Sequence, residues 1–286
     1  MPFDPTEQTD IRLLSLGQLM QAGRWQLNLA HDRSEHLLIW ITRGQGVCLL
    51  DGARRGIGTH NALFIPARQL MAIDPGRQGF GQVLVLPGVS PQTLPQTVQH
   101  LRIRDVAAQK DLTMILESLG REQNQQAPLY QSAVDAFSEL AIIWLRRQID
   151  QADGQTGGQA NGPEPRETAA HRLVRAYCAR LVTQFASGAS MADHAAALGV
   201  TPTHLTRVCR AETGLTAATL LTQRVLHAAH HLLISTQAPV QDIARHLGFG
   251  SAAYFTRFMQ AHTGQSPTAL RRGRANRQPT AAAKSI

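Results

Sequence analysis

The sequence predicts a two-domain α+β fold: a small N-terminal β-barrel that carries a helical hairpin, followed by a C-terminal all-α domain. Three observations support this prediction. Short apolar segments separated by turn residues fill about residues 11–90, a pattern typical of antiparallel strands. Two segments with helical periodicity follow at about 107–149. One helix-turn-helix pattern then occurs twice within residues 167–273, and a long helix joins the two copies.

The strand region contains about seven apolar runs, among them HLLIWITRG and GQVLVLP, each bounded by Gly, Asp or Pro. Strands of this length and spacing are expected to form a small barrel or a sandwich, and we take the barrel as the prediction. The turn-rich sequence PGVSPQTLP at 87–95 then ends the predicted strand region.

One strand offers candidate residues for binding a small-molecule effector. A period of two places His36, Leu38 and Trp40 on the same face. If that face lines a barrel interior, His36 and Trp40 would present a polar group and a flat apolar surface to an effector. Alternatively, Trp40 belongs to the core and His36 forms its hydrogen bonds within the sheet. His31, His36 and His60 are scattered, so we expect no metal, no cofactor and no enzyme activity.

The helical hairpin, about residues 107–149, has one strongly apolar stripe that must be buried. It can pack on the barrel or against a second copy of the chain, and we expect a homodimer. The following segment, 151–166, is rich in Gly and Pro and is predicted to be a flexible linker. Residues 1–150 would then form an effector-sensing and dimerisation domain.

The C-terminal domain repeats one unit about fifty residues apart. MADHAAALGVTPTHLTRVCRAETGLT and PVQDIARHLGFGSAAYFTRFMQAHTGQSP share a short helix, a glycine turn and a second helix that carries Arg on its outer face. In a helix-turn-helix, this second helix enters the DNA major groove. The equivalent positions are Ala195 and Ala244, Leu198-Gly199 and Leu247-Gly248, Thr206-Arg207 and Thr256-Arg257, and Thr213-Gly214 and Thr263-Gly264.

Capping signals define the helices around the repeats. A helix at 167–185 precedes Ser190, which is expected to cap the next helix together with Asp193. Thr201-Pro202 begins the first reading helix. The connecting helix at 215–234 would be about 27 Å long, approaching the roughly 34 Å repeat of DNA. Two reading helices joined in this way could enter successive major grooves. His230 and His231, on this helix, are expected to face solvent or phosphate.

The charge distribution supports a nucleic-acid partner. Residues 166–286 contain 14 Lys and Arg against 4 Asp and Glu, whereas residues 1–165 contain 14 against 16. A concentrated positive charge favours a polyanion because binding releases counterions. The isolated Cys48, Cys178 and Cys209 argue against disulfides and zinc sites. With no secretory signal and no long apolar run, we expect a soluble cytoplasmic protein without membrane contact, ending in a disordered basic tail at 274–286.

The C-terminal part resembles the DNA-binding domain of the AraC/XylS family of transcription regulators. The motifs that carry the resemblance are Leu198-Gly199-Val200-Thr201, Leu205-Thr206-Arg207, Thr213-Gly214, Ile243-Ala244, Leu247-Gly248-Phe249, Tyr254-Phe255-Thr256-Arg257-Phe258, Thr263-Gly264-Gln265-Ser266-Pro267 and Leu270-Arg271. The resemblance implies a cupin-like sensor barrel, double-stranded promoter DNA and RNA polymerase as partners, and activation of a catabolic operon. The effector would be an aromatic or carboxylic acid. A barrel that only dimerises the protein is an alternative, and a barrel enzyme is a second one.

Residue by residue, the resemblance implies which side chains meet DNA. Arg207 would read guanine, which contributes about 1 to 3 kcal/mol of discrimination. Because two of the base-facing residues in the second unit are alanines, we expect the first half-site to be the more stringent. The predicted base contacts are Thr203, Thr206, Arg207, Ala252, Ala253, Thr256 and Arg257, and the predicted phosphate contacts are Thr201, His204, Arg210, Arg224, Arg245, Ser251, Arg271 and Arg272.

Overall fold

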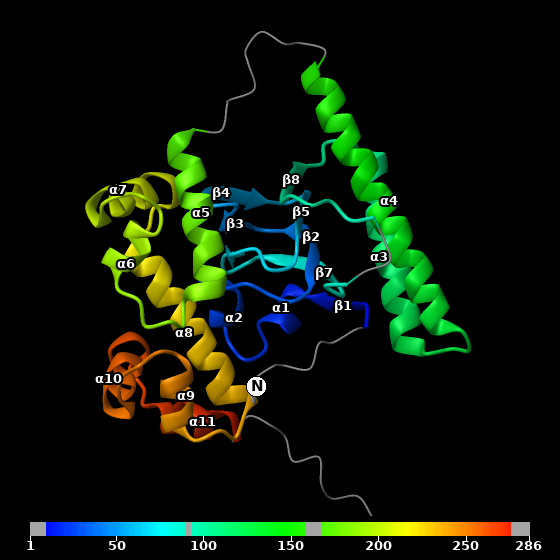
Figure 1. Ribbon diagram of the computed structural model, residues 1–286. Coiled ribbons are helices and arrows are strands. Elements are labelled where there is room, and N and C mark those ends of the chain that lie inside the picture. Colours follow the sequence, from blue (N-terminus) through cyan, green and yellow to red (C-terminus); the bar gives the residue numbers. More distant parts are fainter. Residues whose placement is uncertain (1–9, 90–92, 158–167, 276–286) are drawn as a thin grey trace, which may run out of the picture.

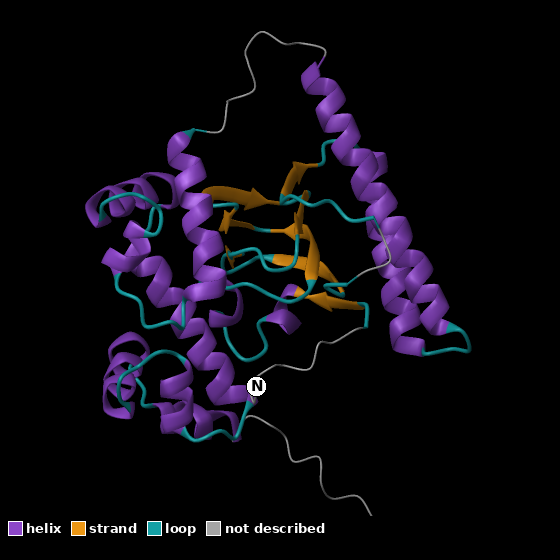
Figure 2. Ribbon diagram, viewed as in Figure 1, coloured by secondary structure: helices purple, strands orange, loops and turns teal. Residues whose placement is uncertain are grey.

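The computed structural model describes residues 10–89, 93–157 and 168–275. An N-terminal α+β domain contains two antiparallel sheets and a helical hairpin, and the C-terminal domain is all helical. In Figure 1 the sheets lie between the hairpin, on the right, and the C-terminal helices, on the left. Figure 2 shows the same separation, with the strands confined to the middle of the molecule. The predicted α+β class and the helical C-terminal domain are thus correct.

The strands form two separate sheets rather than a closed barrel within the described residues. The five-stranded sheet has the order β1-β7-β2-β5-β8 and the three-stranded sheet has the order β4-β3-β6. The sandwich alternative therefore fits better than the predicted barrel. One strand, β8, lies beyond the expected end of the strand region. The bounds are β1 Arg12–Ser15, β2 His36–Arg43, β3 Gln45–Leu50, β4 Ala53–Gly58, β5 Asn61–Ile65, β6 Met71–Asp74, β7 Phe80–Leu86 and β8 Gln99–Arg102.

The central strand β2 is buried on both faces, and its two faces contribute to different cores. Leu37, Ile39 and Ile41 pack with residues of the three-stranded sheet, which forms the core between the sheets. Leu38 and Trp40 point the other way and pack against the helical hairpin. The second face therefore belongs to the sheet–hairpin core, which explains why the run LLIWI at 37–41 is apolar throughout instead of alternating with polar residues.

Short helices α1 (Leu16–Leu19) and α2 (Trp25–Asn28) interrupt the strand region, and the hairpin consists of α3 (Val106–Gln125) and α4 (Tyr130–Gly157). Asp105 caps α3 by accepting hydrogen bonds from two backbone amides. Helix α4 continues into the segment that we expected to be a flexible linker, so the start of that segment is helical. The remainder of the expected linker, and the tail beyond Ala275, lie outside the described residues.

The C-terminal domain contains seven helices within the described residues, close to the predicted limits. Thr168, Ser190, Thr201, Thr216 and Ser251 each accept a hydrogen bond at a helix N-terminus. Ser190 and Asp193 form the expected capping box. The helices are α5 Ala169–Gln184, α6 Met191–Ala196, α7 Pro202–Thr213, α8 Ala217–Ser235, α9 Val240–His246, α10 Ala252–Thr263 and α11 Pro267–Ala275.

Candidate nucleic-acid interface

The two glycine turns have the same backbone hydrogen bonds, which confirms the duplication. Val200 donates its amide to the Ala195 carbonyl at 3.0 Å, and Phe249 donates to Ala244 at 2.9 Å. The glycines that precede them, Gly199 and Gly248, have positive φ angles of 69° and 78°. A residue with a Cβ rarely adopts this conformation, so glycine is required at the turn of each unit.

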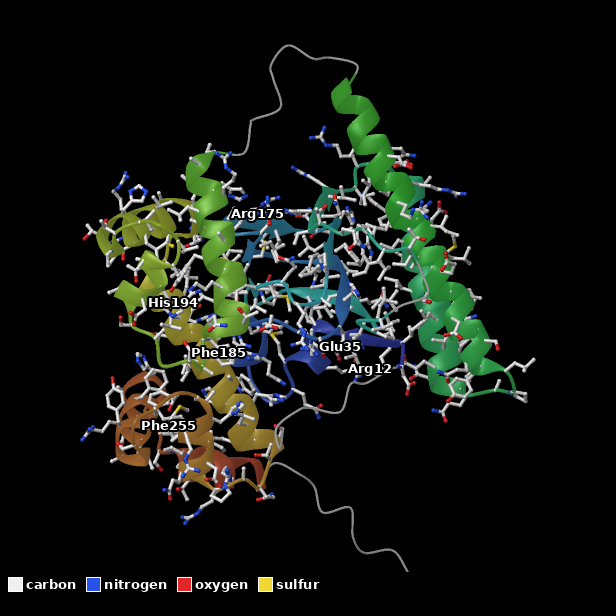
Figure 3. The ribbon with its side chains drawn as sticks, viewed as in Figure 1. Arg12, Glu35, Arg175, Phe185, His194 and Phe255 are labelled. Carbon is white, nitrogen blue, oxygen red and sulfur yellow. The ribbon has the colours of Figure 1, made fainter. Side chains whose placement is uncertain are left out.

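The second helices of the two units also end alike. The hydroxyl of Thr213 donates to the Cys209 carbonyl, and that of Thr263 donates to the Met259 carbonyl, both at 2.7 Å. Each threonine is followed by a glycine in the left-handed conformation. Each unit has its own apolar core, and Phe255 is the largest fully buried side chain of the second (Figure 3).

Helix α7 exposes most of the residues predicted to read bases in the first half-site. Thr203 and Arg207 are exposed and Thr206 is partly buried. The Arg207 Nη2 atom lies 3.2 Å from His204 Nδ1, one turn earlier on the same surface. The opposite face, with Leu205 and the buried Cys209, packs in the core of the unit. An exposed cationic face on a rigidly packed helix is suited to a major groove.

Helix α10 presents the equivalent face in the second unit. Ala253 and Arg257 are exposed, whereas Ala252 and Thr256 are partly buried. The Thr256 hydroxyl donates to the Ala252 carbonyl at 2.8 Å, so its hydrogen is already used within the helix. The Arg257 guanidinium carbon lies 6.0 Å from the centre of the Tyr254 ring, and Tyr254 is itself exposed. This face offers fewer free hydrogen-bond donors than α7.

Most of the predicted phosphate contacts lie on the surface. Thr201, His204, Arg210, Arg245, Ser251 and Arg272 are exposed. Arg245 also lies 3.5 Å from Asp242 in an exposed ion pair, which leaves its charge accessible. These side chains are free to turn toward a backbone phosphate, and their contacts with DNA stay predictions.

Two predicted phosphate contacts are corrected by the structure. Arg224 is buried, and its Nη2 atom lies 2.6 Å from Asp32 Oδ1 in the N-terminal domain. Arg271 donates from Nη2 to the Ala238 carbonyl at 2.6 Å, and its Nε lies 3.4 Å from the Leu233 carbonyl, so it joins α11 to the end of α8. In this conformation both guanidinium groups are therefore engaged in contacts within the protein.

The predicted effector residues are also corrected. Trp40 is buried between β2 and the hairpin, and its Nε1 atom donates to the Thr113 hydroxyl at 3.2 Å. His36 accepts from the Ala67 amide through Nδ1 at 3.1 Å, while its Nε2 lies 3.2 Å from the Gly88 carbonyl. Both side chains point away from the core between the sheets. They follow the alternative interpretation: Trp40 belongs to the core and His36 is a hydrogen-bonded strand residue.

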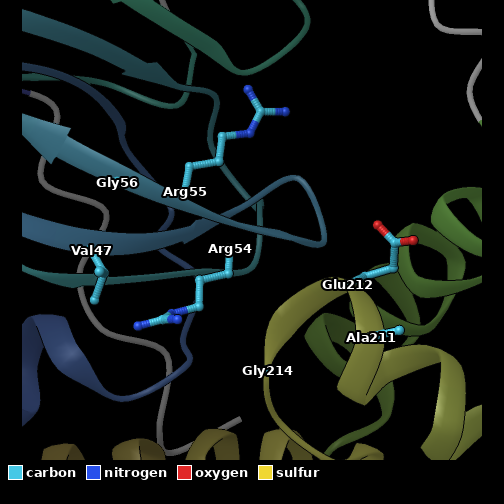
Figure 4. Close-up of a pocket in the computed structure, with 7 residues that line it drawn as sticks. All are labelled: Val47, Arg54, Arg55, Gly56, Ala211, Glu212 and Gly214. Carbon is cyan, nitrogen blue, oxygen red and sulfur yellow. The ribbon is translucent and has the colours of Figure 1, made fainter.

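A cleft of about 340 Å³ lies between the domains, where β4 approaches the C-terminal end of α7. Arg54 and Arg55 line one side, and Glu212 and Gly214 line the other (Figure 4). The two arginine side chains leave β4 in different directions in the close-up, as adjacent strand residues do. They do not converge on one point, and the cleft also contains a carboxylate.

Sequence reasoning missed a contact between the domains that is centred on α8. Arg224 joins Asp32 and also lies over the Phe185 ring, with 3.7 Å from the guanidinium carbon to the ring centre. His227 stacks on His31 at 4.2 Å between ring centres. His230, expected to face solvent or phosphate, is instead buried, whereas His231 is exposed as expected. No local signal in the sequence links residues 32 and 224.

Comparisons with known proteins agree with this geometry. Residues 194–273, which contain both units, match a helix-turn-helix domain family. The chain is 24% identical to the transcriptional activator RhaS of Klebsiella pneumoniae (strain 342), over 85% of this chain and 87% of that protein. It is 26% identical to RhaS of Enterobacter sp. (strain 638), over 64% of this chain and 63% of that protein. These similarities support the resemblance of the two units to the AraC/XylS family of DNA-binding transcription regulators.

Two solved structures are also similar to this chain. ToxT from Vibrio cholerae O395 matches 92% of the chain at 9% identity with a TM-score of 0.39, covering 96% of ToxT. The C-terminal domain of AraT from Geobacillus stearothermophilus matches 42% of the chain at 26% identity with a TM-score of 0.35, covering 96% of that domain. Within the described residues, Cys48, Cys178 and Cys209 are buried free thiols, and no helix is long and apolar enough to cross a membrane.

Proposed function

We propose that the protein regulates transcription by reading a bipartite promoter site with α7 and α10, one helix in each of two successive major grooves. The observation that carries this proposal is the duplicated unit, with its two exposed reading helices joined by the single continuous helix α8. In Figure 1, α7 and α10 both lie on the outer side of the C-terminal domain. One chain then recognises two half-sites about 10 base pairs apart.

Within each half-site, the predicted contacts divide into two groups. Thr203, Thr206 and Arg207 read bases in the first groove, and Ala252, Ala253, Thr256 and Arg257 face bases in the second. The exposed Thr201, His204, Arg210, Arg245, Ser251 and Arg272 position the protein on phosphates. The amides at the N-termini of α7 and α10 strengthen this positioning, because helix N-termini attract phosphate oxygens.

Selection from a random DNA pool, followed by footprinting with the full chain, tests this function. We expect enrichment of a sequence with two conserved blocks on one face of the duplex. Enrichment of one block only would contradict reading by both units. Binding that shows no sequence preference, even at low salt, would overturn sequence-specific regulation. The double variant Arg207→Ala with Arg257→Ala is the control. It should retain the fold but lose the preference for the selected DNA sequence.

We further propose that the N-terminal domain binds a small effector, an aromatic or carboxylic acid, and makes regulation depend on it. The protein bound at its promoter would then activate RNA polymerase. Support comes from the relatives' description as activators and from the separate sheet domain in contact with α8. Thermal-shift screening of such acids tests the effector. No shift with any compound would favour the alternative in which the N-terminal domain only dimerises the protein.

Dimerisation through the hairpin is part of the same proposal. The hairpin exposes three large apolar side chains: Met114 on α3, Leu129 in the turn before α4, and Leu140 on α4 are 57%, 81% and 47% exposed. Association of two copies through these side chains would bury them and place two DNA-binding domains on one promoter. Sedimentation equilibrium of the full chain and of Leu140→Glu should give a dimer and a monomer, respectively. A monomeric wild-type chain at micromolar concentration would contradict this.

A further inference from the structure

One short segment of the N-terminal domain, residues 25–33, crosses the junction of the two DNA-reading units. Leu29 packs against the core of the second unit, whereas its neighbour Ala30 packs in the core of the first. The Ala30 amide donates to Gln223 Oε1 on α8 at 3.2 Å. The other side of the segment is fixed to β6 through paired backbone hydrogen bonds between His31 and Met71. This interdomain segment therefore connects the sheets to both units at once.

Four aromatic rings make the central part of the contact, and three of them belong to histidines. His31 stacks on His227 at 4.2 Å with an interplanar angle of 11°, and Trp25 stacks on His230 at 4.9 Å with an angle of 16°. Trp25 also meets His227 edge-on at 5.3 Å. We call His31, His227 and His230 the interdomain histidine cluster. Two imidazoles stacked this closely repel each other when both are charged.

The charges around the cluster also oppose protonation. Arg33 and Arg224 lie close enough to lower the pKa values of His31 and His227, and His231 on α8 acts on His227 in the same direction. The nearby carboxylates are already engaged: Asp32 pairs with Arg224 and Arg68, and Glu35 pairs with Arg12 and Arg33. A proton on the cluster thus meets an excess of positive charge and no unpaired carboxylate within the described residues.

Burial and charge both act on the pKa values. Burial, partly offset by the hydrogen bond to the Leu29 carbonyl, lowers the pKa of His31 to about 3. Burial, followed by the charges of His31 and Arg224, holds the pKa of His227 well below its ordinary value. Burial also lowers the pKa of His230. All three rings are therefore neutral while the contact is closed.

Neutral rings leave part of the hydrogen-bonding capacity of the cluster unused. His31 Nε2 and His230 Nδ1 are buried and have no hydrogen-bond partner among the described residues, and the same is true of Arg224 Nε. A buried polar atom without a partner destabilises the closed contact, because opening would expose it to water. The contact is therefore held closed by apolar packing, ring stacking, the hydrogen bond from Ala30 to Gln223 and one ion pair, against an electrostatic and desolvation cost.

We propose that this contact is a proton-operated latch between the domains: it is closed while the interdomain histidines are neutral and opens when they take up protons. Opening of the latch separates α8 from the interdomain segment. Any effect of this opening on promoter binding rests on the proposed function. The latch itself is a property of the chain without DNA. The experiment that tests the latch therefore uses no DNA. A negative result for the latch leaves the proposed DNA binding intact, and a negative result for DNA binding leaves the latch intact.

The expected pH dependence follows from the lowered pKa values. Because the closed contact lowers them, its stability is complete above about pH 6.5, the ordinary histidine pKa, and declines as the pH falls below that value. The opening constant is the equilibrium ratio of the open to the closed contact. A histidine that stays neutral in the closed contact and has its ordinary pKa of about 6.5 in the open one raises this constant about tenfold between pH 7.5 and 5.5. His31 and His227 together raise it about 100-fold, and His230, whose pKa is lowered less, adds only a smaller factor.

Hydrogen exchange of the full chain at pH 7.5 and 5.5, corrected for intrinsic exchange rates, measures this opening. We expect peptides covering 25–33 and 223–231 to show about a 100-fold higher opening constant at the lower pH, while peptides from β2 and β7 stay protected. His227→Gln should reduce the pH response to about tenfold. His31→Gln should do the same, and it provides a second test if the first variant does not fold.

His204→Gln is the matched control, because His204 is exposed on α7 and lies outside the contact; it should retain the full pH response. An opening constant that does not change between the two pH values would overturn the latch. So would a full 100-fold response in both His227→Gln and His31→Gln. If β2 and β7 lost their protection from hydrogen exchange together with the interdomain peptides, low pH would be unfolding the whole N-terminal domain. That result would also overturn the latch.

Discussion

The guanidinium of Arg224 lies 2.6 Å from the carboxylate of Asp32, and this buried ion pair joins the helix between the two DNA-reading units to the N-terminal domain. The side chains are only 10% and 4% exposed. The ring of Phe185, which follows the end of α5, covers the guanidinium at 3.7 Å from its carbon to the ring centre. Since α8 carries both units, any movement of the N-terminal domain that breaks this pair acts on the helix that sets their spacing.

Removing one partner of this pair should therefore be costly. Asp32→Ala leaves a buried, unpaired guanidinium, and we expect the free energy of unfolding to fall by about 3 to 5 kcal/mol. Asp242→Ala is the control, because it breaks the exposed pair with Arg245, and it should cost less than about 1 kcal/mol. Urea unfolding followed by circular dichroism measures both. Equal losses in the two variants would show that Asp32 and Arg224 do not form a buried pair in solution.

The two reading helices should differ in stringency. Arg207 offers its donors from a surface shared with two threonines, whereas Arg257 is flanked by alanines and by Thr256, whose hydroxyl donates within the helix. We expect Arg207→Ala to reduce discrimination between the selected site and a site mutated in the first block by about 1 to 3 kcal/mol. The matching loss for Arg257→Ala should be smaller. Competition binding with single-block mutant sites provides the measurement, and equal losses would contradict the ranking.

The sequence predicts phosphate contacts for both Arg210 and Arg271, but the salt dependence of DNA affinity should distinguish them. Arg210 is exposed, so Arg210→Ala should weaken binding to every DNA sequence and reduce the slope of log K against log salt by about one. Arg271 is bonded to the Leu233 and Ala238 carbonyls, so Arg271→Ala should lower stability and leave that slope unchanged. Titrations at several salt concentrations distinguish the two. A reduced slope for Arg271→Ala would restore it to the phosphate contacts.

Local signals in the sequence predicted the C-terminal domain well. Ser190 and Thr201 cap helices as expected because a capping hydroxyl reaches only two or three residues along the chain. The same short range explains why the glycine turns were found. The repeat added the one long-range inference that could be made, since two copies of a unit must fold alike.

Predictions that depend on which sheet, helix or domain packs against a given residue are less accurate. A period of two correctly placed Leu38 and Trp40 on one face of β2, but it cannot tell whether a sheet or a helix covers that face. The ion pair of Asp32 with Arg224 spans 192 positions, so neither residue differs in its local sequence from a surface charge. For this reason the sequence suggests a phosphate contact for Arg224 and an orientation toward solvent or phosphate for His230, whereas both residues are buried.

The turn glycines of the two units provide a final test, because they share a conformation but not an environment. A Cβ at Gly248 would lie 2.6 Å from both the Ala186 carbonyl oxygen and the Gly188 amide nitrogen, and neither backbone atom can move aside easily. A Cβ at Gly199 would have no heavy atom within 4 Å among its surroundings. Gly199→Ala should therefore cost only the strain of the left-handed conformation, about 1 to 2 kcal/mol, whereas Gly248→Ala should cost clearly more.

Urea unfolding of both variants measures the difference, with Gly273→Ala as the control. Gly273 lies in α11 with open space around its Cα and no positive φ, so alanine there should be neutral or slightly stabilising. In DNA footprints, Gly248→Ala should weaken protection of the second block before the first, because the second unit contains the strained turn. If Gly199→Ala is as destabilising as Gly248→Ala, the close approach of Gly248 to Ala186 and Gly188 does not exist in solution, and the two turns are equivalent in packing as well as in conformation.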